Sequence, residues 1–109
     1  MDQLLQALSD GSRRTVLEIL RTRPATVGDL AEALPIARPG VSRHLRVLRE
    51  AGLVDVEQQG QWRIYRLRPE PLAELDSWLR RYRAVWEHRL GALHTEVARG
   101  KREKKRRKS

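Results

Sequence analysis

The fold is decided by the stretch RPGVSRHLRVLREAG, residues 38–52. Val41, Leu45 and Leu48 recur in it at intervals of four and three, which predicts a helix with one buried apolar face. The opposite side is mainly polar and basic, with a proline in the first turn, where the missing N–H of proline has no intrahelical partner. Gly52 suits the left-handed position that ends a helix. The stretch therefore predicts an amphipathic helix with a basic outer face.

The residues that follow, LVDVEQQGQWRIYRL, change the period of the apolar positions from about 3.6 to about two. Val54 and Val56 precede Gly60, and Trp62 and Ile64 follow it, alternating with charged residues. Alternation around a glycine predicts a β-hairpin with these four residues on its apolar side. Gly60 is expected to supply the positive φ of the turn.

Three shorter helices are expected before this stretch, and one long helix after the hairpin. Thr26 and Asp29 provide a capping oxygen and an acid for the third helix. Arg13 and Arg14 are expected to face outward from the second helix. The expected ranges are 2–8, 11–22 and 26–34 for the first three helices, and about Pro71 to Ala98 for the last. The prediction is a mainly α fold with a small β-hairpin.

The positive charge is concentrated at the C-terminal end. The 109 residues have a net charge of +9, and the last eleven, RGKREKKRRKS, hold eight of the 23 basic residues. Residues 1–98, expected to form one folded domain, then carry 15 basic and 13 acidic residues. Residues 99–109 are expected to be a disordered tail that contacts phosphates non-specifically, because a run of like charge repels itself. The tail residues assigned to phosphates are Lys101, Arg102, Lys104, Lys105, Arg106, Arg107 and Lys108.

The composition argues against several classes of protein. Cysteine is absent, which removes disulfides and thiolate metal ligands. No apolar run is long enough to span a membrane, and the polar start MDQLLQALSD does not resemble a signal peptide, so a cytoplasmic, nucleoid-associated location is expected. Ser42 and His44 point about 200° apart on their helix, and Gly40 and Gly60 are isolated glycines, so no enzyme activity is expected.

The helices expected at 26–34 and from residue 38 are separated only by PIA, which predicts a helix-turn-helix. In such motifs the second helix enters the major groove of double-stranded DNA, and a following hairpin can act as a wing on the minor groove or backbone. Arginine suits both guanine edges and phosphates. The residues expected to contact DNA are Arg38, Gly40, Ser42, Arg43, His44 and Arg46 on the helix, and Gln59, Gln61 and Arg63 on the wing. The alternative is a basic face that is simply solvated.

Three segments resemble the ArsR/SmtB family of winged-helix repressors. They are ALSDGSRRTVLEIL from Ala7, TVGDLAEALPIARPGVSRHLRVLREAGLVDVEQQGQWRIYRL from Thr26, and the long final helix, so the resemblance covers about residues 3–98. It implies a winged helix-turn-helix of four helices, a hairpin and a fifth helix. It also implies that the third and fourth helices read DNA, and that the first and last helices form a homodimer.

The sequence supports a dimer independently of the resemblance. A final helix of roughly 28 residues is ~42 Å long, more than so small a domain can cover. Its apolar stripe would be a large exposed patch in a monomer, and contact with a second copy would remove it. The residues assigned to this interface are Leu4, Leu5, Leu8, Leu75, Leu79, Tyr82, Trp86, Leu90 and Leu93. The alternative is that the whole stripe is core of its own chain.

The sequence departs from the metal-sensing members that it resembles. Thr26 and Gly28 stand where such members have the two cysteines of a stretch like CVCDLA. A second family site would use Asp76, His88, His94 and Glu96, but the two histidines are six residues apart and their faces differ by about 120°. No metal and no cofactor are therefore expected, and the chain resembles the metal-independent branch, in which simple autorepressors occur. The remaining alternatives are a non-specific nucleic-acid binder driven by the tail and a winged-helix module for protein contacts.

Overall fold

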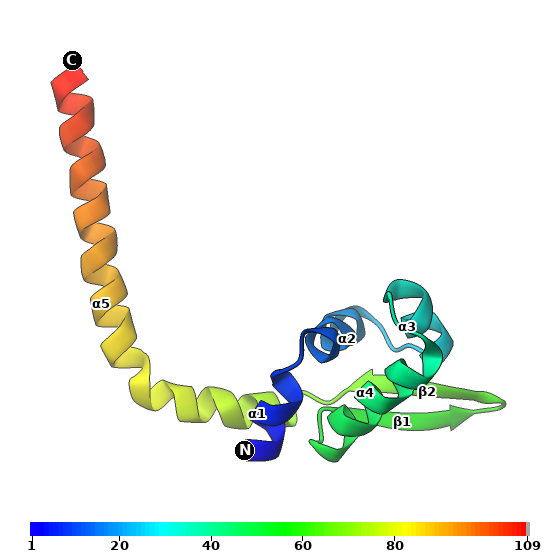
Figure 1. The fold of residues 1–109 in the computed structure, drawn as a ribbon. Coiled ribbons are helices and arrows are strands. Elements are labelled where there is room, and N and C mark those ends of the chain that lie inside the picture. The colour runs from blue at the N-terminus through cyan, green and yellow to red at the C-terminus, as the bar shows by residue number, and fades with distance from the viewer. Residues whose placement is uncertain (109) are drawn as a thin grey trace. The chain divides into compact units, whose positions relative to one another are not determined.

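The computed structural model describes the backbone of residues 1–108 and the side chains of residues 1–91. The elements, in order, are α1 (Asp2–Leu8), α2 (Gly11–Thr22), α3 (Val27–Ala33), α4 (Arg38–Glu50), β1 (Val54–Gln59), β2 (Trp62–Leu67) and α5 (Glu70–Lys108) (Figure 1). The chain divides into two compact units, one of residues 1–75 and one from residue 76 onward. The predicted order of helices and hairpin is confirmed.

Local capping contacts fix where the helices begin and end. The Asp10 carboxylate accepts a hydrogen bond from the backbone N–H of Arg13 at 3.0 Å and caps α2, and this bond lowers the pKa of Asp10. Thr26 and Asp29 form a reciprocal capping box at the start of α3, with both hydrogen bonds at 3.1 Å. Gly52, with φ of +77°, follows the end of α4 in the left-handed region. The caps predicted from Thr26, Asp29 and Gly52 are confirmed.

One continuous core holds the first unit together. The apolar stripe of α4 that the sequence predicted, Val41, Leu45 and Leu48, is at most 1% exposed. Leu72 and Leu75, in the first turns of α5, pack against the same core. The other buried members of this core are Leu4, Ala7, Val16, Leu17, Leu20, Ala25, Leu30, Leu34, Leu53, Val54 and Tyr65.

The arginines at the start of α2 do not simply face outward, as the sequence suggested. The Arg13 Nε donates to the carbonyl of Ala7 at 2.8 Å, and the Arg14 Nη1 donates to the carbonyl of Leu8 at 2.7 Å. The last carbonyls of α1 have no partner within their own helix, so the two guanidinium groups satisfy them. Arg14 is exposed and Arg13 is partly buried, so both lie outside the core as expected, and the preceding helix supplies acceptors that the sequence reasoning did not foresee.

The register of the hairpin corrects the predicted apolar side. Val56 lies opposite Tyr65, so these two side chains share one face, while Trp62 and Ile64 lie on the other face. Tyr65 is 8% exposed and Trp62 is 58% exposed. The turn between the strands consists of Gly60, with the predicted positive φ of +61°, and one further residue. This two-residue turn sets the pairing of the strands. As a result, Tyr65 lies on the same face as Val56, and Trp62 lies on the opposite face.

A short backbone bridge joins β2 to the segment before α3. The N–H of Ala25 donates to the carbonyl of Tyr65 at 3.0 Å, and the N–H of Tyr65 donates to the carbonyl of Ala25 at 2.8 Å. Because β2 also pairs with β1 on its other edge, Tyr65 is held from both sides. The bridge was not predicted, and it fixes the start of α3 against the hairpin.

The final helix runs further than predicted. α5 begins at Glu70 and continues to Lys108, so the expected end at Ala98 was wrong. Arginine, lysine and glutamate are strong helix formers, which the prediction gave too little weight. The disorder expected for residues 99–109 when the protein is free of DNA remains a prediction. The phosphate contacts assigned to their side chains also remain predictions, because those side chains lie outside the described residues. Within the part of the chain that is described, no helix is long and apolar enough to cross a membrane.

Candidate nucleic-acid interface

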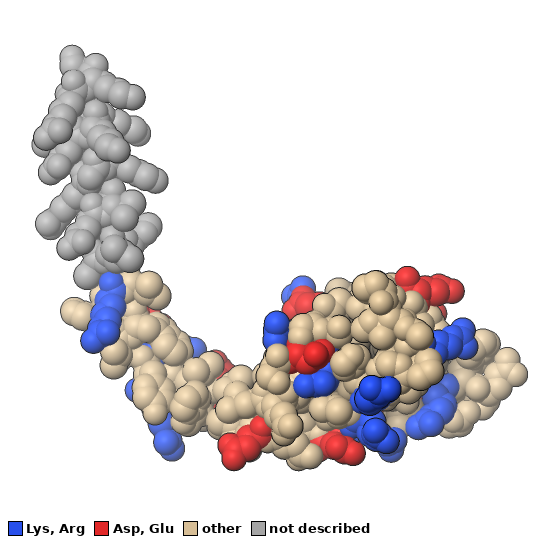
Figure 2. Space-filling view, in the orientation of Figure 1, with Lys and Arg blue, Asp and Glu red and all other residues tan. Residues whose placement is uncertain are grey.

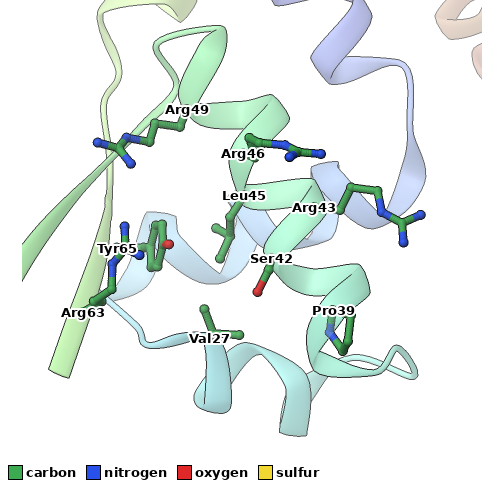
Figure 3. Close-up of a pocket in the computed structure, with 9 residues that line it drawn as sticks. All are labelled: Val27, Pro39, Ser42, Arg43, Leu45, Arg46, Arg49, Arg63 and Tyr65. Atoms are coloured by element: carbon green, nitrogen blue, oxygen red, sulfur yellow. The ribbon is translucent and has the colours of Figure 1, made fainter. Parts of the chain in front are cut away.

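A groove of about 460 Å³ lies between α4 and β2, with the first residue of α3 at its edge (Figure 3). α4 contributes most of its lining, and β2 contributes two residues. The residues that line it are Val27, Pro39, Ser42, Arg43, Leu45, Arg46, Arg49, Arg63 and Tyr65. The groove therefore joins the predicted recognition helix to the predicted wing in one continuous surface.

The groove is strongly basic, since four of its nine lining residues are arginines and none is a carboxylate. Figure 2 shows the basic side chains gathered over α4 and the neighbouring part of the hairpin. Among the side chains that the structure describes, these four guanidinium groups make no hydrogen bond and no ion pair. Several arginines elsewhere are paired, for example Arg66 with Glu57 at 3.4 Å and Arg80 with Asp76 at 3.0 Å. The groove arginines thus remain available for an external anion or a guanine edge.

The four arginines are divided between the two sides of α4. In Figure 3, Arg43 and Arg46 extend to one side of the helix, and Arg49 extends to the other, toward the hairpin. Arg63 lies on that hairpin side, beside the Tyr65 ring, with its Cζ atom 6.0 Å from the ring centroid. The site therefore has two pairs of arginines rather than one uniform basic patch.

The predicted recognition residues fall into two groups. Ser42, Arg43 and Arg46 line the groove, as the prediction requires. Arg38 does not line it, and its guanidinium lies over the first turn of α3, where a Cβ on Gly28 would be 3.2 Å from Arg38 Nη2. The assignment of Arg38 to the reading surface is thus not supported by the position of its side chain.

Gly40 and His44 have structural partners instead of positions in the groove. A Cβ built on Gly40 would lie 2.6 Å from Cγ2 of Ile36, so the absence of a side chain allows the turn before α4 to pack against the helix. The His44 side chain is 20% exposed, and its Nδ1 lies 3.8 Å from the carboxylate of Asp10, the residue that caps α2. These two residues help to position α4, and their contact with DNA stays a prediction.

The wing residues are also divided. Arg63 lines the groove, whereas Gln59 and Gln61 are exposed at the tip of the hairpin, outside it. Gln58 stabilises the turn, because its Nε2 donates to the carbonyl of Gly60 at 2.8 Å. The tip is therefore a second surface, separate from the groove.

Two groove residues were missed by the sequence reasoning, Arg49 and Tyr65. Arg49 was detectable, because it lies seven residues after Ser42, two turns further along the same helix, and so projects close to the direction of Ser42. Tyr65 was missed because the wrong register placed it on the outer side of the hairpin. Its position depends on pairing with β1 and Ala25, which no local pattern reveals.

The residues assigned to a dimer interface have unequal exposure. Leu4 is 4% exposed and packs in the core of its own chain, so it offers little surface to a second copy. Leu5, Tyr82 and Leu90 are 42%, 47% and 61% exposed, respectively. Leu8 and Leu75 pack partly against the core of their own chain. The remaining assignments are Leu79 and Trp86, which are half-buried, and Leu93, which lies outside the described side chains.

Two further apolar residues widen the exposed stripe on α5. Trp78 is 38% exposed and Val85 is 55% exposed. The Trp78 ring lies 5.1 Å from the Tyr82 ring, centroid to centroid, in a tilted arrangement. The prediction omitted both residues because it followed a single line of positions three and four apart.

The positions compared above with family metal sites have other partners. Both carboxylate oxygens of Asp76 are bound to arginines, one to Arg80 at 3.0 Å and the other to Arg83 at 3.4 Å. The Thr26 hydroxyl belongs to the capping box of α3. Among residues 1–91, no group of three or more histidine, cysteine, aspartate or glutamate residues could hold a metal ion. His94 and Glu96 lie outside the described side chains.

A helix pair joined by a short turn, followed by a hairpin that shares a basic groove with the second helix, defines a winged helix-turn-helix protein. Residues 10–56 match the family model described as bacterial regulatory protein, arsR family. The chain is 47% identical over 81 residues to the HTH-type transcriptional regulator Rv2034 of Mycobacterium tuberculosis, covering 74% of this chain and 76% of that protein. It is 33% identical over 79 residues to the transcriptional repressor SdpR of Bacillus subtilis, covering 72% and 88% of the two chains.

A solved structure, the ArsR-like transcriptional regulator from Rhodococcus sp. RHA1, matches with a TM-score of 0.70 and 32% identity, over 84% of this chain and 87% of that one. The chain belongs to the ArsR family of bacterial transcriptional regulators. Members of this family are transcriptional regulators rather than enzymes.

Proposed function

We propose that the chain is a homodimeric repressor that binds a palindromic operator, with α4 in the major groove and the hairpin on the flanking backbone or minor groove. The observation that carries this proposal is the basic groove, which is lined by four arginines and no carboxylate, and whose guanidinium groups have no partner among the side chains of residues 1–91. Repression is supported by the likeness to SdpR, which is itself named a transcriptional repressor. Autorepression is the simplest form of such regulation.

Binding selection from a random DNA library tests the proposal directly. The purified protein is expected to enrich a palindrome whose half-sites are about 10 base pairs apart, centre to centre. Preference for that palindrome over random duplex is expected to be about 10³-fold or more at physiological salt. A library without any enriched motif would contradict specific binding.

The homodimer rests on two exposed apolar faces, one on α1 and one on α5. Leu5, Tyr82 and Leu90 are each more than two-fifths exposed, and such apolar surface is costly in water. A second copy of the chain is the proposed cover, because an isologous contact buries the same residues on both protomers. Sedimentation analysis is expected to give twice the mass of one chain, and a monomer at micromolar concentration would overturn this part of the proposal.

Metal-independent action is the proposed mode within the family. Thr26 and Gly28 offer no soft ligand, and the Asp76 carboxylate would have to exchange two arginines for a metal. Operator affinity is therefore expected to be unchanged by zinc or by a chelator. A change of more than tenfold with either would show that another donor set binds metal.

A tail-driven, non-specific binder is the competing function, favoured by the eight basic residues among the last eleven. Such a protein would lose roughly 10³-fold or more in affinity between 50 and 200 mM salt and show no preference for sequence. The library selection separates the two functions, because only specific readout enriches a motif.

A further inference from the structure

We infer that Arg49 and Arg63 form a clamp for a single phosphate of the DNA backbone, at the side of the groove that faces the hairpin. This inference rests on the proposed function. It assigns one pair of groove arginines to the DNA backbone and the other pair to the bases. Arg49 comes from the last turn of α4 and Arg63 comes from β2, so the clamp joins the two elements that define the fold.

Charge balance identifies the chemistry of the ligand. Arg49 and Arg63 line the same groove, no acidic residue lines it, and neither guanidinium has a carboxylate or carbonyl partner among the described side chains. Two cations that share a groove repel each other, and a monovalent phosphodiester placed between them removes that repulsion. The free protein thus carries an unfavourable interaction that an anion relieves.

Both arginines extend from backbone that is already fixed. The carbonyl of Arg49 accepts a hydrogen bond from the N–H of Gly52 at 3.0 Å, which closes the end of α4. Arg63 is two residues from Tyr65 on the same face of β2, and its guanidinium lies over the Tyr65 ring. Tyr65 is 8% exposed and is bonded to Ala25 on one edge and paired with β1 on the other. Rigid supports reduce the entropy lost when the clamp closes on a phosphate.

The other pair, Arg43 and Arg46, extends to the opposite side of α4. A helix that lies in the major groove faces the base edges at the floor of the groove, and its sides face the phosphate backbone of the two DNA strands. Because the hairpin covers only the flank with Arg49, that flank is assigned to the backbone. Arg43 and Arg46 are left to read bases.

The test measures affinity as a function of salt for the selected operator and for a scrambled duplex. Arg49→Ala and Arg63→Ala are each expected to weaken binding by about tenfold, equally for both duplexes. The double variant is expected to reduce the slope of log K against log salt by about 0.9 per protomer, the value for one phosphate. A reduction of about 1.8 per protomer would mean two separate phosphates and would overturn the shared clamp.

A neutral methylphosphonate, placed at one position at a time along the operator, locates the phosphate. One position in each half-site is expected at which the methylphosphonate itself weakens binding. On that modified operator, Arg49→Ala and Arg63→Ala are expected to cause no further loss of affinity. If no position suppresses both effects, the clamp is refuted. Arg66→Ala is the matched control on the same strand, because Arg66 lies on the opposite face and is already paired with Glu57, so its slope is expected to be that of the wild type.

Failure of the clamp can be distinguished from failure of the proposed function. If the wild-type protein prefers the operator while Arg49→Ala and Arg63→Ala lower only that preference, these residues read bases and the clamp is wrong. If the wild-type protein has no preference for any sequence, the proposed function itself is wrong.

Discussion

Replacing Gly40 by alanine places a methyl group where the structure has no room for one. The new Cβ would lie 2.6 Å from Cγ2 of Ile36, about 1 Å inside an ordinary carbon–carbon contact. Cγ2 is attached directly to the branched Cβ of Ile36, so it cannot swing away without a change of χ1 or a shift of the turn before α4. Overpacking of this kind costs about 1–3 kcal/mol. Alanine returns up to about 1 kcal/mol through helix propensity, so a net loss of about 1–2 kcal/mol is expected.

Thermal unfolding at a fixed protomer concentration measures this loss. For a domain of this size, a change of 1 kcal/mol shifts Tm by roughly 4–8 °C. Gly11→Ala is the matched control, because Gly11 also lies in the first turn of a helix and its added Cβ would be 3.7 Å from the end of the Arg14 side chain. Gly11→Ala is expected to leave Tm unchanged or to raise it slightly.

The double variant Gly40→Ala with Ile36→Ala isolates the contact. Ile36→Ala removes Cγ2, so the second methyl group finds the space that the wild-type chain lacks. The double variant is therefore expected to be more stable than the sum of the two single losses, by about the cost of the clash. Strict additivity, or a Gly40→Ala protein as stable as the wild type, would refute the packing argument.

Three further predictions concern the DNA surface, the tail and the caps. Arg43→Ala and Arg46→Ala are each expected to cost about 1–3 kcal/mol on the selected operator and to relax its sequence preference in a binding titration, and unchanged preference in both would place the readout elsewhere. Deletion of residues 99–109 is expected to lower affinity equally for all sequences and to flatten the salt slope, so a loss confined to the operator would contradict the tail's role. The hydrogen bonds from the Thr26 N–H and hydroxyl lower the pKa of Asp29, so its contribution to stability is complete above pH ~4 and is lost as the pH falls through the lowered value. Asp29→Asn is thus expected to lower Tm at pH 7 but not at pH 2, and an equal effect at both values would exclude a role for the charge.

The sequence predicts well those parts of the fold in which the interacting residues lie within a few positions of each other. Thr26 and Asp29 satisfy each other's backbone across three residues, so their spacing alone marks the start of α3. Gly52 ends α4 because a left-handed residue there lets the following N–H groups return to the last turn. In both cases the interaction and its sequence signal occupy the same few residues.

The hairpin shows where local reasoning fails. Val56 pairs with Tyr65 because the length of the two-residue turn determines the register of the strands. A shift of one residue in that register would move every side chain to the other face. Trp62 is more apolar than the arginine beside it, so a pattern of hydrophobicity favours the wrong side. The bridge between Ala25 and Tyr65 joins segments forty residues apart and leaves no periodic trace in either one.

The candidate site depends even more on contacts that are distant in sequence. Arg38, Arg43, Arg46 and Arg49 have the same side chain, so residue type alone gives no reason to prefer one to another as a ligand for DNA. Arg38 lies over α3, while the other three line a groove that holds no carboxylate. The chain has 23 basic and 14 acidic residues, so some arginines have an acidic partner and others do not. Asp76 binds two arginines on α5, whereas no acidic residue lines the groove beside α4. The proposed function depends on a cluster of positive charges without an acidic neighbour, and this cluster exists only once β2 and α4 have come together.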